Sequence, residues 1–362
     1  MRIRRQSWMP CVAFALLAQM PLAALAAPAA EDAARCVDLA DDAARLRCYD
    51  LALKRPAPAP AAAPSAGAIA GTRNVVFPHE PATRAVAADE HPVVRSLLDS
   101  RWELDESSKQ GEFHIRAYKP VYLLPVFYTS DTNQRPSTPA PGRTVTQSRN
   151  LQAIETVYQL SLKTKLWENI FGDNGDLWTG YTQVSHWQLY NDAQSRPFSE
   201  TNYEPEVMLT FRTNYDVLGW NGRLFGLAVN HQSNGRGLPL SRSWNRVMLN
   251  LGFERDGWTL MLRPWWRVHD DNDDNPDISD YIGRGDLQLV HVWNGHEFAL
   301  MARHSLRGGD RSRGALQFEW AFPIAGDLRG HLQLFDGYGQ SLIDYNHRAW
   351  YFGLGVSLLE WY

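Results

Sequence analysis

The fold is decided by residues 350–362, which read WYFGLGVSLLEWY. Large apolar side chains occupy every second position from Trp350 to Leu358, and mostly small or polar residues stand between them. A period of two places alternate side chains on opposite faces of a β-strand. One face of this strand is therefore apolar, and either a protein core or lipid must cover it.

The same alternation recurs from residue 119 onward, in segments of about ten residues. Leu160 and Leu162, for example, alternate with Ser161 and Lys163. We predict strands at 119–129, 156–166, 176–190, 203–213, 223–234, 242–252, 257–267, 284–294, 297–305, 316–322, 328–334 and 350–358. About ten residues suffice for a tilted strand to cross a bilayer, and an even strand number suits a closed barrel. The sequence thus predicts an all-β fold, a twelve-stranded antiparallel transmembrane β-barrel.

Composition supports a barrel and excludes other classes of protein. A formal net charge of −4 over 362 residues argues against a nucleic-acid partner. The mean hydropathy of −0.39 excludes several membrane-spanning helices, whereas alternating strands keep this average low. Twelve of the 14 tryptophans lie between Trp167 and Trp361, many near predicted strand ends, as in an aromatic girdle. The aromatic Tyr362 resembles the sorting signal of bacterial outer-membrane proteins. The alternative to a membrane barrel is a soluble exported β-sandwich.

The first 92 residues differ from the rest in composition. Residues 1–27 are typical of a secretory signal peptide, because arginines precede an apolar stretch that ends in Ala-Leu-Ala; a retained membrane anchor is the alternative. Residues 28–53 carry Cys36 and Cys48, and an even pair in an exported chain favours a disulfide between two short helical turns; two unpaired thiols are the alternative. Residues 54–92 read as a Pro/Ala-rich linker. The large domain is expected at 93–362.

Residues 230–246, NHQSNGRGLPLSRSWNR, combine residue types suited to ester hydrolysis. His231 and Ser233 share a strand face, and a hairpin centred on Leu238 pairs 231 with 245 and 233 with 243. A serine hydroxyl needs a base, histidine can take and return that proton, and an asparagine carbonyl can fix the imidazole tautomer. We interpret Ser233 as nucleophile, His231 as base and Asn245 as orienting residue. The alternative is ordinary polar strand surface.

The run N-H-Q-S-N-G-R followed by S-R-S-W-N-R resembles bacterial outer-membrane phospholipase A. Other segments resemble that family in the same order along the chain: 119–125, 180–183, 187–189, 197–198, 200–205 and 274–278. The resemblance covers roughly residues 93–362, and the H-x-S-N-G-R block is its most specific part. It implies a twelve-stranded barrel with His231, Ser233 and Asn245 on the outer, lipid-facing side.

The resemblance also implies a Ca²⁺ requirement and activation by formation of a homodimer. The ligands it implies are the backbone carbonyl of Arg236 and the hydroxyl of Ser241. Ser195 would complete the site from the opposite subunit, and Asp274 matches an acidic position used in the monomeric form. Such a site has few charged ligands, so we expect calcium binding and dimerisation to be coupled.

Two further positions bear on this expectation. Gln183 matches a polar residue buried at the dimer interface of the family. Leu238 is a departure, because the family pattern has an acidic residue there, and we expect a weaker calcium site in the isolated monomer.

The sequence therefore predicts a calcium-dependent phospholipase A1/A2 of the bacterial outer membrane. Its substrates would be the sn-1 and sn-2 acyl esters of phospholipids and of their lyso-products. Two alternatives come from other classes: a porin-like barrel that only conducts or binds, and a soluble carbohydrate-binding sandwich. The Ser–His–Asn row argues against the porin, because a channel has no need of it.

Overall fold

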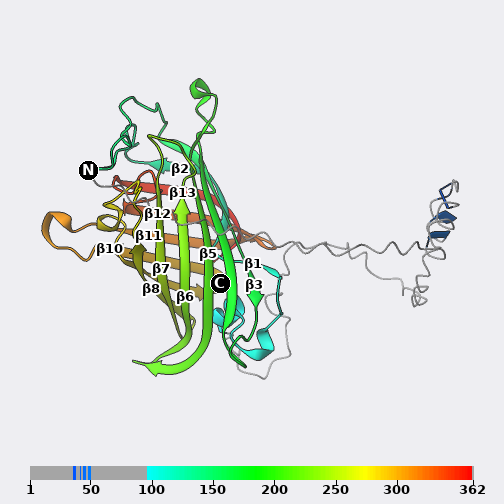
Figure 1. Ribbon diagram of the computed structural model, residues 1–362. Coiled ribbons are helices and arrows are strands. Elements are labelled where there is room, and N and C mark those ends of the chain that lie inside the picture. The colour runs from blue at the N-terminus through cyan, green and yellow to red at the C-terminus, as the bar shows by residue number, and fades with distance from the viewer. Residues whose placement is uncertain (1–35, 38–40, 42–43, 46–47, 50–95, 361–362) are drawn as a thin grey trace, which may run out of the picture. The chain divides into compact units, whose positions relative to one another are not determined.

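The computed structural model describes residues 36–37, 41, 44–45, 48–49 and 96–360 (Figure 1). The chain divides into two compact units, Met1–Asn74 and Val75–Tyr362. In the first unit Cys36 and Cys48 form a disulfide with 5.6 Å between their Cα atoms, which confirms the predicted pairing, and residues 44–45 and 48–49 are helical. The predicted signal peptide, the linker and the terminal aromatic residue lie outside the described residues.

The second unit is a closed antiparallel barrel. Its strands are β1 (Ile115–Ala117), β2 (Val121–Thr129), β3 (Ile154–Trp167), β4 (Asp176–Trp187), β5 (Phe198–Val217), β6 (Trp220–Ser233), β7 (Ser243–Arg255), β8 (Trp258–Val268), β9 (Gly285–Trp293), β10 (His296–His304), β11 (Gly314–Ala325), β12 (Leu328–Tyr338) and β13 (Arg348–Leu359). Each sequential pair from β2 to β13 is hydrogen-bonded, and β13 pairs with β2, which closes the barrel. Strands β2 to β13 correspond one to one to the twelve predicted segments.

The short strand β1 is not a thirteenth strand of the barrel wall. β1 and β2 both pair with β3, while β4 occupies the other edge of β3. β1 therefore continues β2 along the same edge, past an interruption at residues 118–120 that contains Pro120, which has no N–H to donate. The predicted count of twelve is confirmed.

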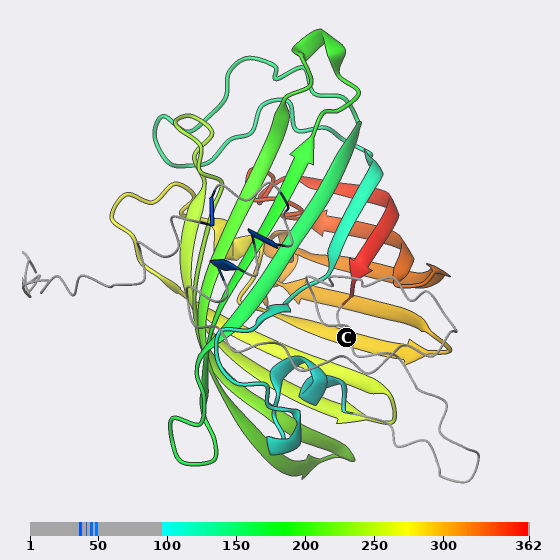
Figure 2. The same cartoon turned by 90° about the vertical axis from the view of Figure 1, so that its right-hand side faces the viewer.

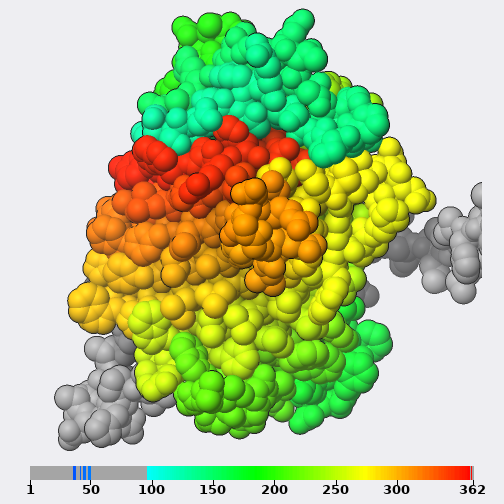
Figure 3. Space-filling model, turned by 90° about the vertical axis from the view of Figure 1, so that its left-hand side faces the viewer, coloured from blue at the N-terminus to red at the C-terminus, as the bar shows by residue number. Residues whose placement is uncertain are grey.

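The two ends of the barrel differ in the length of their connections. At one end the turns 218–219, 256–257, 294–295 and 326–327 have two residues each. Asp256-Gly257 and Asn294-Gly295 have positive φ at both positions, as tight hairpin turns require. The other end carries loops 130–153, 188–197, 234–242, 269–284, 305–313 and 339–347. Figure 3 shows the loop side, with 130–153 in teal, 305–313 in orange and 339–347 in red.

Side chains alternate between the wall's outer face and the interior. On β6, Leu227 and Val229 are exposed, and Ala228 between them is buried. The exposed apolar set runs round the barrel and includes Leu123, Val126, Leu160, Leu162, Val207, Val247, Leu287, Leu316, Leu334 and Leu354. Such a band on a closed barrel is the surface that lipid covers.

The tryptophans correct part of the sequence interpretation. Trp167, Trp258 and Trp293 are exposed at the short-turn end, and Trp266 and Trp350 are exposed at the loop end, as an aromatic girdle requires. Four others, Trp102, Trp178, Trp244 and Trp265, are buried in the interior core. Their indole rings fill volume inside the barrel, so the tryptophan excess has two causes.

Charged side chains fill much of the remaining interior. Lys119 Nζ lies 2.8 Å and Arg246 Nη2 lies 3.0 Å from the carboxylate of Glu204. Arg263 pairs with Asp286 at 2.8 Å. The cavity among these groups has a volume of about 200 Å³, enough for several water molecules. A lumen so filled does not favour the porin-like alternative.

A short helix occupies the short-turn end. Helix α3 (Leu97–Trp102) begins after Ser96, whose hydroxyl accepts a hydrogen bond from Asp99 N at 2.9 Å. Glu254 of β7 accepts hydrogen bonds from Ser96 Oγ at 2.6 Å and Leu98 N at 2.7 Å. Leu98 and Trp102 are buried in the interior core. Figure 2 shows this helix, in cyan, at the mouth of the barrel beside the short turns.

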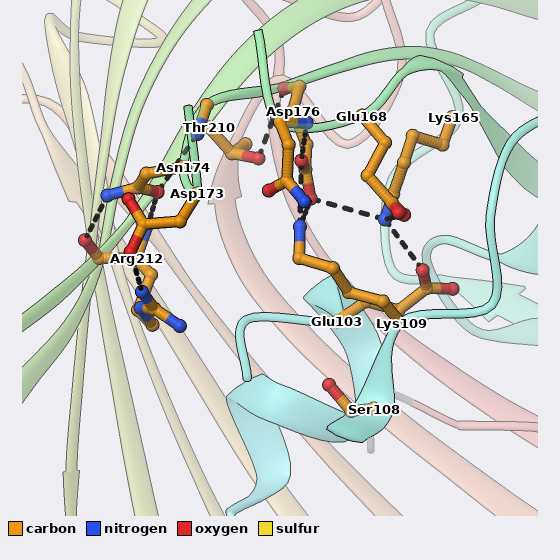
Figure 4. Close-up of polar contacts among 12 residues, drawn as sticks. Glu103, Ser108, Lys109, Lys165, Glu168, Asp173, Asn174, Asp176, Thr210 and Arg212 are labelled. Atoms are coloured by element: carbon orange, nitrogen blue, oxygen red, sulfur yellow. Dashed lines mark hydrogen bonds and ion pairs between the residues drawn. The ribbon is translucent and has the colours of Figure 1, made fainter. Parts of the chain in front are cut away.

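A network of ion pairs fixes the chain that follows the helix (Figure 4). Lys165 Nζ of β3 lies 2.8 Å from Glu103, 2.5 Å from Glu168 and 3.2 Å from Asp176. Lys109 also pairs with Asp176, at 2.9 Å.

The remaining short elements are the 3₁₀ turns η1 (Glu106–Ser108), η2 (Asp192–Gln194), η3 (Ile278–Asp280) and η4 (Gly309–Arg311). Among the described residues there is no helix of sufficient length and apolarity to span a bilayer.

Candidate active site

The predicted hairpin is formed by β6 and β7. The register pairs His231 with Asn245 and Ser233 with Ser243, as the sequence analysis expected. Directly paired residues share a face, and residues two apart on one strand also share it. His231, Ser233, Asn245 and Ser243 therefore lie together on one face of the wall.

That face is the outer one. His231 follows the exposed Leu227 and Val229 at intervals of two, and it is itself exposed. Asn230, directly before it, is fully buried in the interior. β6 ends at Ser233, so the four residues lie at the loop end of the barrel, at the border of the apolar band.

The hydrogen bond between His231 and Asn245 determines the imidazole tautomer. Nδ1 of His231 lies 2.7 Å from Oδ1 of Asn245. A carboxamide oxygen can only accept, so Nδ1 carries the proton and donates it. Nε2 of the neutral ring is then unprotonated and able to accept a proton. Ser233 lies two residues along the same strand, on the same face.

A second Ser–His pair has the opposite tautomer. His304 Nε2 lies 3.0 Å from Ser312 Oγ, and His304 Nδ1 accepts the backbone N–H of Leu306 at 2.9 Å. In a neutral ring Nε2 must then carry the proton, so it cannot take one from Ser312. The hydrogen-bond partners of the two imidazoles thus place the proton on opposite ring nitrogens, Nδ1 in His231 and Nε2 in His304.

Two of the four predicted calcium ligands are in direct contact. Ser241 Oγ donates to Asp274 Oδ2 at 2.7 Å, and Ser243 Oγ donates to the same oxygen at 3.3 Å. Arg143 Nε lies 2.6 Å from Asp274 Oδ1. Burial raises the pKa of Asp274, but the hydrogen bonds from Ser241 and Arg143 and the charge of Arg143 outweigh it, and the pKa is lowered.

The other two predicted ligands lie in loops beside the hairpin. Arg236 belongs to loop 234–242, and its guanidinium donates to the carbonyls of Phe198 at 2.7 Å and Ser199 at 2.9 Å. Ser195 follows η2 in the separate loop 188–197, with a left-handed backbone (φ 58°). The structure thus joins Ser241 to Asp274, and Ser195 lies in the separate loop 188–197.

The chemistry of this donor set fits Ca²⁺. Hydroxyl, carbonyl and carboxylate oxygens are the ligands that this hard cation prefers. Within residues 96–360 and the described part of the N-terminal unit, no group of three or more His, Cys, Asp or Glu side chains is placed to hold a metal. The predicted calcium ligands include a single carboxylate, that of Asp274, so they supply little negative charge. The guanidinium of Arg143 already offsets this charge.

Two partners of Asp274, Arg143 and Ser243, were not predicted from the sequence. Arg143 lies 131 positions away in the chain, in the β2–β3 loop, and no local pattern marks it. Ser243 was detectable in principle, because the predicted register already placed it opposite Ser233.

A row of paired residues connects the hairpin to the neighbouring strands. Gln183 of β4 pairs with Tyr203 of β5, and Tyr203 pairs with Ser233 of β6. Strands are spaced about 4.8 Å apart, so Gln183 lies roughly 10 Å from the Ser233 position at the same height on the outer face. The exposed Leu160 of β3 continues this row beyond Gln183.

The fold and this site define a transmembrane β-barrel of the outer-membrane class that carries a Ser–His–Asn row on its outer wall. The sequence model of the phospholipase A1 family matches residues 98–358. The chain belongs to this family and is a phospholipase.

Relatives and solved structures agree with this assignment. A protein of Neisseria meningitidis serogroup B is 36% identical over 351 residues, 91% of each chain. Phospholipase A1 of Escherichia coli K12 is 37% identical over 247 residues, 68% of this chain and 82% of its own. The Escherichia coli outer membrane phospholipase A structure has a TM-score of 0.62 at 35% identity, covering 68% of this chain and 95% of its own. A Salmonella typhi outer membrane phospholipase dimer with bound calcium has a TM-score of 0.63 at 35% identity, covering 70% and 95%.

Proposed function

We propose that this phospholipase resides in the bacterial outer membrane and hydrolyses sn-1 and sn-2 acyl esters of phospholipids and lysophospholipids. Ser233 acts as the nucleophile, His231 as the base and Asn245 as the orienting residue. The observation that carries this proposal is the 2.7 Å hydrogen bond from His231 Nδ1 to Asn245 Oδ1 on a lipid-facing surface. It prepares Nε2 as a base where ester substrates are embedded.

Each residue has a defined part in the reaction. Ser233 Oγ attacks the ester carbonyl carbon while His231 Nε2 takes the hydroxyl proton. The bond from that carbon to the glycerol oxygen breaks, and the imidazolium returns the proton to the leaving alcohol. Water then attacks the acyl-serine, with His231 again as the base, and the fatty acid is released. Asn245 holds the ring in the same tautomer through both halves.

We further propose that the enzyme requires Ca²⁺, held by the Arg236 carbonyl and the Ser241 hydroxyl. Ser195 of the partner subunit completes the site in the dimer, and Asp274 is the acidic ligand in the monomeric form. When bound, the ion supplies electrostatic stabilisation for the oxyanion of the tetrahedral intermediate. The contact between Ser241 and Asp274 supports this assignment, as does the calcium bound to the Salmonella typhi relative.

The active form is proposed to be a homodimer, like that relative. Gln183 supports this, because it is a polar side chain on the outer face beside the exposed Leu160 and Leu162. Its amide accepts a hydrogen bond from Tyr181 Oη at 3.1 Å and donates one to Ser185 Oγ at 3.1 Å, which makes a polar row on the outer face that a second subunit can cover. A partner docked there would stand two strands from Ser233 and could present Ser195 to the site.

The proposal is tested by phospholipid hydrolysis in detergent, with Ca²⁺, with EDTA, and with the Ser233→Ala variant. We expect activity only in the first case, because the variant has no nucleophile and EDTA removes the ion. Ser312→Ala is the matched control, because it removes the serine of the other Ser–His pair and should retain wild-type activity.

The outcomes separate the parts of the proposal. Full activity of Ser233→Ala would overturn the mechanism. Activity that persists in EDTA would remove the metal assignment and leave the catalytic residues standing.

A further inference from the structure

Asn234, the residue after Ser233, ties together both ends of loop 234–242. Its Nδ2 donates to the carbonyl of Leu240 at 2.8 Å. Its Oδ1 accepts the backbone N–H of Arg242 at 3.0 Å and of Arg236 at 3.3 Å. Its own backbone N–H donates to the carbonyl of Arg242 at 3.0 Å. Asn234 therefore holds the backbone at residues 236, 240 and 242 in fixed positions relative to one another.

The same carboxamide is anchored to the barrel interior through Glu200 of β5. Asn234 Nδ2 also donates to Glu200 Oε1, at 3.0 Å, and Asn202 donates to that oxygen at 2.9 Å. Asn234 and Glu200 are each only 3% exposed. A buried carboxylate needs donors, and Asn234 supplies one of them from the proposed active-site loop.

We propose that Asn234 is a positioning residue of this site, which sets the geometry of Ser233, the Arg236 carbonyl and the Ser241 hydroxyl through the loop between them. This inference rests on the proposed function. The position requires an amide, because one atom must donate to Glu200 and Leu240 while another accepts from Arg236 and Arg242. A carboxylate of the same shape can accept but cannot donate.

The pairing of β6 with β7 lies outside this loop. The two strands are paired from Asn221 with Glu254 to Ser233 with Ser243, and loop 234–242 lies beyond the last pair. Loss of the Asn234 contacts should therefore loosen the loop and leave the wall assembled. This separates a positioning role from a general role in folding.

The test is Asn234→Asp in the full chain, assayed on phospholipid with Ca²⁺. We expect kcat to fall about 10- to 100-fold, the range for losing a hydrogen bond to a charged group, while KM changes less than threefold. Labelling of Ser233 by an alkylsulfonyl fluoride should slow by a similar factor. The unboiled protein should keep the compact gel mobility of the wild type.

Two further variants show whether the amide's donor is the cause. Glu200→Gln in the Asn234→Asp background supplies a donor to the new carboxylate, and we expect it to recover at least threefold in kcat. Asn230→Asp is the matched control, because Asn230 is a buried amide that donates to a glutamate, Glu204, at 2.8 Å. The neighbouring Arg246 and Lys119 can offset its charge, so its kcat should stay within threefold of wild type.

Several results would overturn the inference. Wild-type kcat in Asn234→Asp would do so, as would an equal loss in Asn230→Asp or no recovery in the double variant. Loss of compact mobility would assign Asn234 to the stability of the barrel instead. In each case an inactive Ser233→Ala leaves the proposed function standing, whereas an active Ser233→Ala removes that function itself.

Discussion

Among single residues, the contrast between His231 and His304 shows how a neighbour selects the chemistry of an imidazole. An acceptor at Nδ1, from Asn245, leaves Nε2 of His231 free to accept a proton. A donor at Nδ1, from the Leu306 N–H, makes Nε2 of His304 a donor. Proximity of serine and histidine is therefore not sufficient for a nucleophile–base pair.

Removing the orienting residue gives the first prediction at this scale. Asn245→Ala should lower kcat about tenfold and leave KM nearly unchanged, because one hydrogen bond that orients the base is lost. Steady-state hydrolysis in detergent measures this, with Asn250→Ala, an interior position of the same strand, as the control. An unchanged kcat would mean that Asn245 does not orient the ring during turnover.

Asp274 gives a prediction about pH. Its pKa is lowered in the folded state by Ser241 and Arg143, so its carboxylate stabilises the loop contacts above its ordinary pKa of 3.8. That contribution is lost as the pH falls through the lowered value. The difference in melting temperature between wild type and Asp274→Asn should therefore be smaller at pH 3 than at pH 7. A constant difference across this range would contradict the assignment.

Sequence reasoning at this scale succeeded where residues are joined by strand geometry. Period-two alternation and a symmetric hairpin were sufficient to place Asn245 opposite His231. They could not reveal Arg143, because its contact with Asp274 depends on how two long loops meet. Asn234 was overlooked because its role appears only in the direction of its hydrogen bonds.

Among the elements, α3 shows that the barrel's short-turn end is closed from within. Leu98 and Trp102 pack into the interior core, and an ideal Cβ on Gly252 of β7 would lie 2.9 Å from Leu98 Cδ1. Glycine at position 252 thus gives the helix room to approach the wall. The helix was not predicted, because six residues are too few for a periodic signal.

We expect Leu98→Ala to lower the free energy of unfolding by about 2–5 kcal/mol, because it leaves a cavity in this core. Urea titration in lipid vesicles, followed by tryptophan fluorescence, measures the loss. Ser107→Ala, an exposed position in the following 3₁₀ turn, is the control and should change stability by less than about 0.5 kcal/mol. A similar loss in both variants would mean that α3 does not pack as described.

The whole molecule was predicted most completely, because a closed sheet repeats one simple rule twelve times. Period-two alternation predicted all twelve strands, and their even number indicated a closed barrel, as observed. Strand ends were less predictable: β5 extends from Phe198 to Val217, well beyond the expected 203–213. Pairing with β4 continues to Phe198 at one end, and pairing with β6 continues to Val217 at the other. The direction in which each tryptophan points also required the structure.

The lipid-facing band gives a prediction for the assembled barrel. Leu227→Arg should destabilise the protein in a bilayer by about 2–4 kcal/mol, because it places a charge against hydrocarbon. Refolding into vesicles across a urea series measures this. Leu218→Arg, in a two-residue turn where the side chain is 93% exposed, should have little effect. Equal effects at both positions would argue that lipid does not cover the wall at Leu227.

The height of the Ser–His–Asn row on the wall determines how an enzyme of this design is supplied. Ser233 lies at the loop end, and the hydrocarbon core is about 30 Å thick, so a nucleophile there reaches ester bonds of one leaflet only. Substrate arrives by lateral diffusion within that leaflet, with no tunnel to pass. On the proposed assignment of Ser233, a membrane that keeps its phospholipids in the opposite leaflet withholds substrate from the folded enzyme, and lipid asymmetry limits its activity.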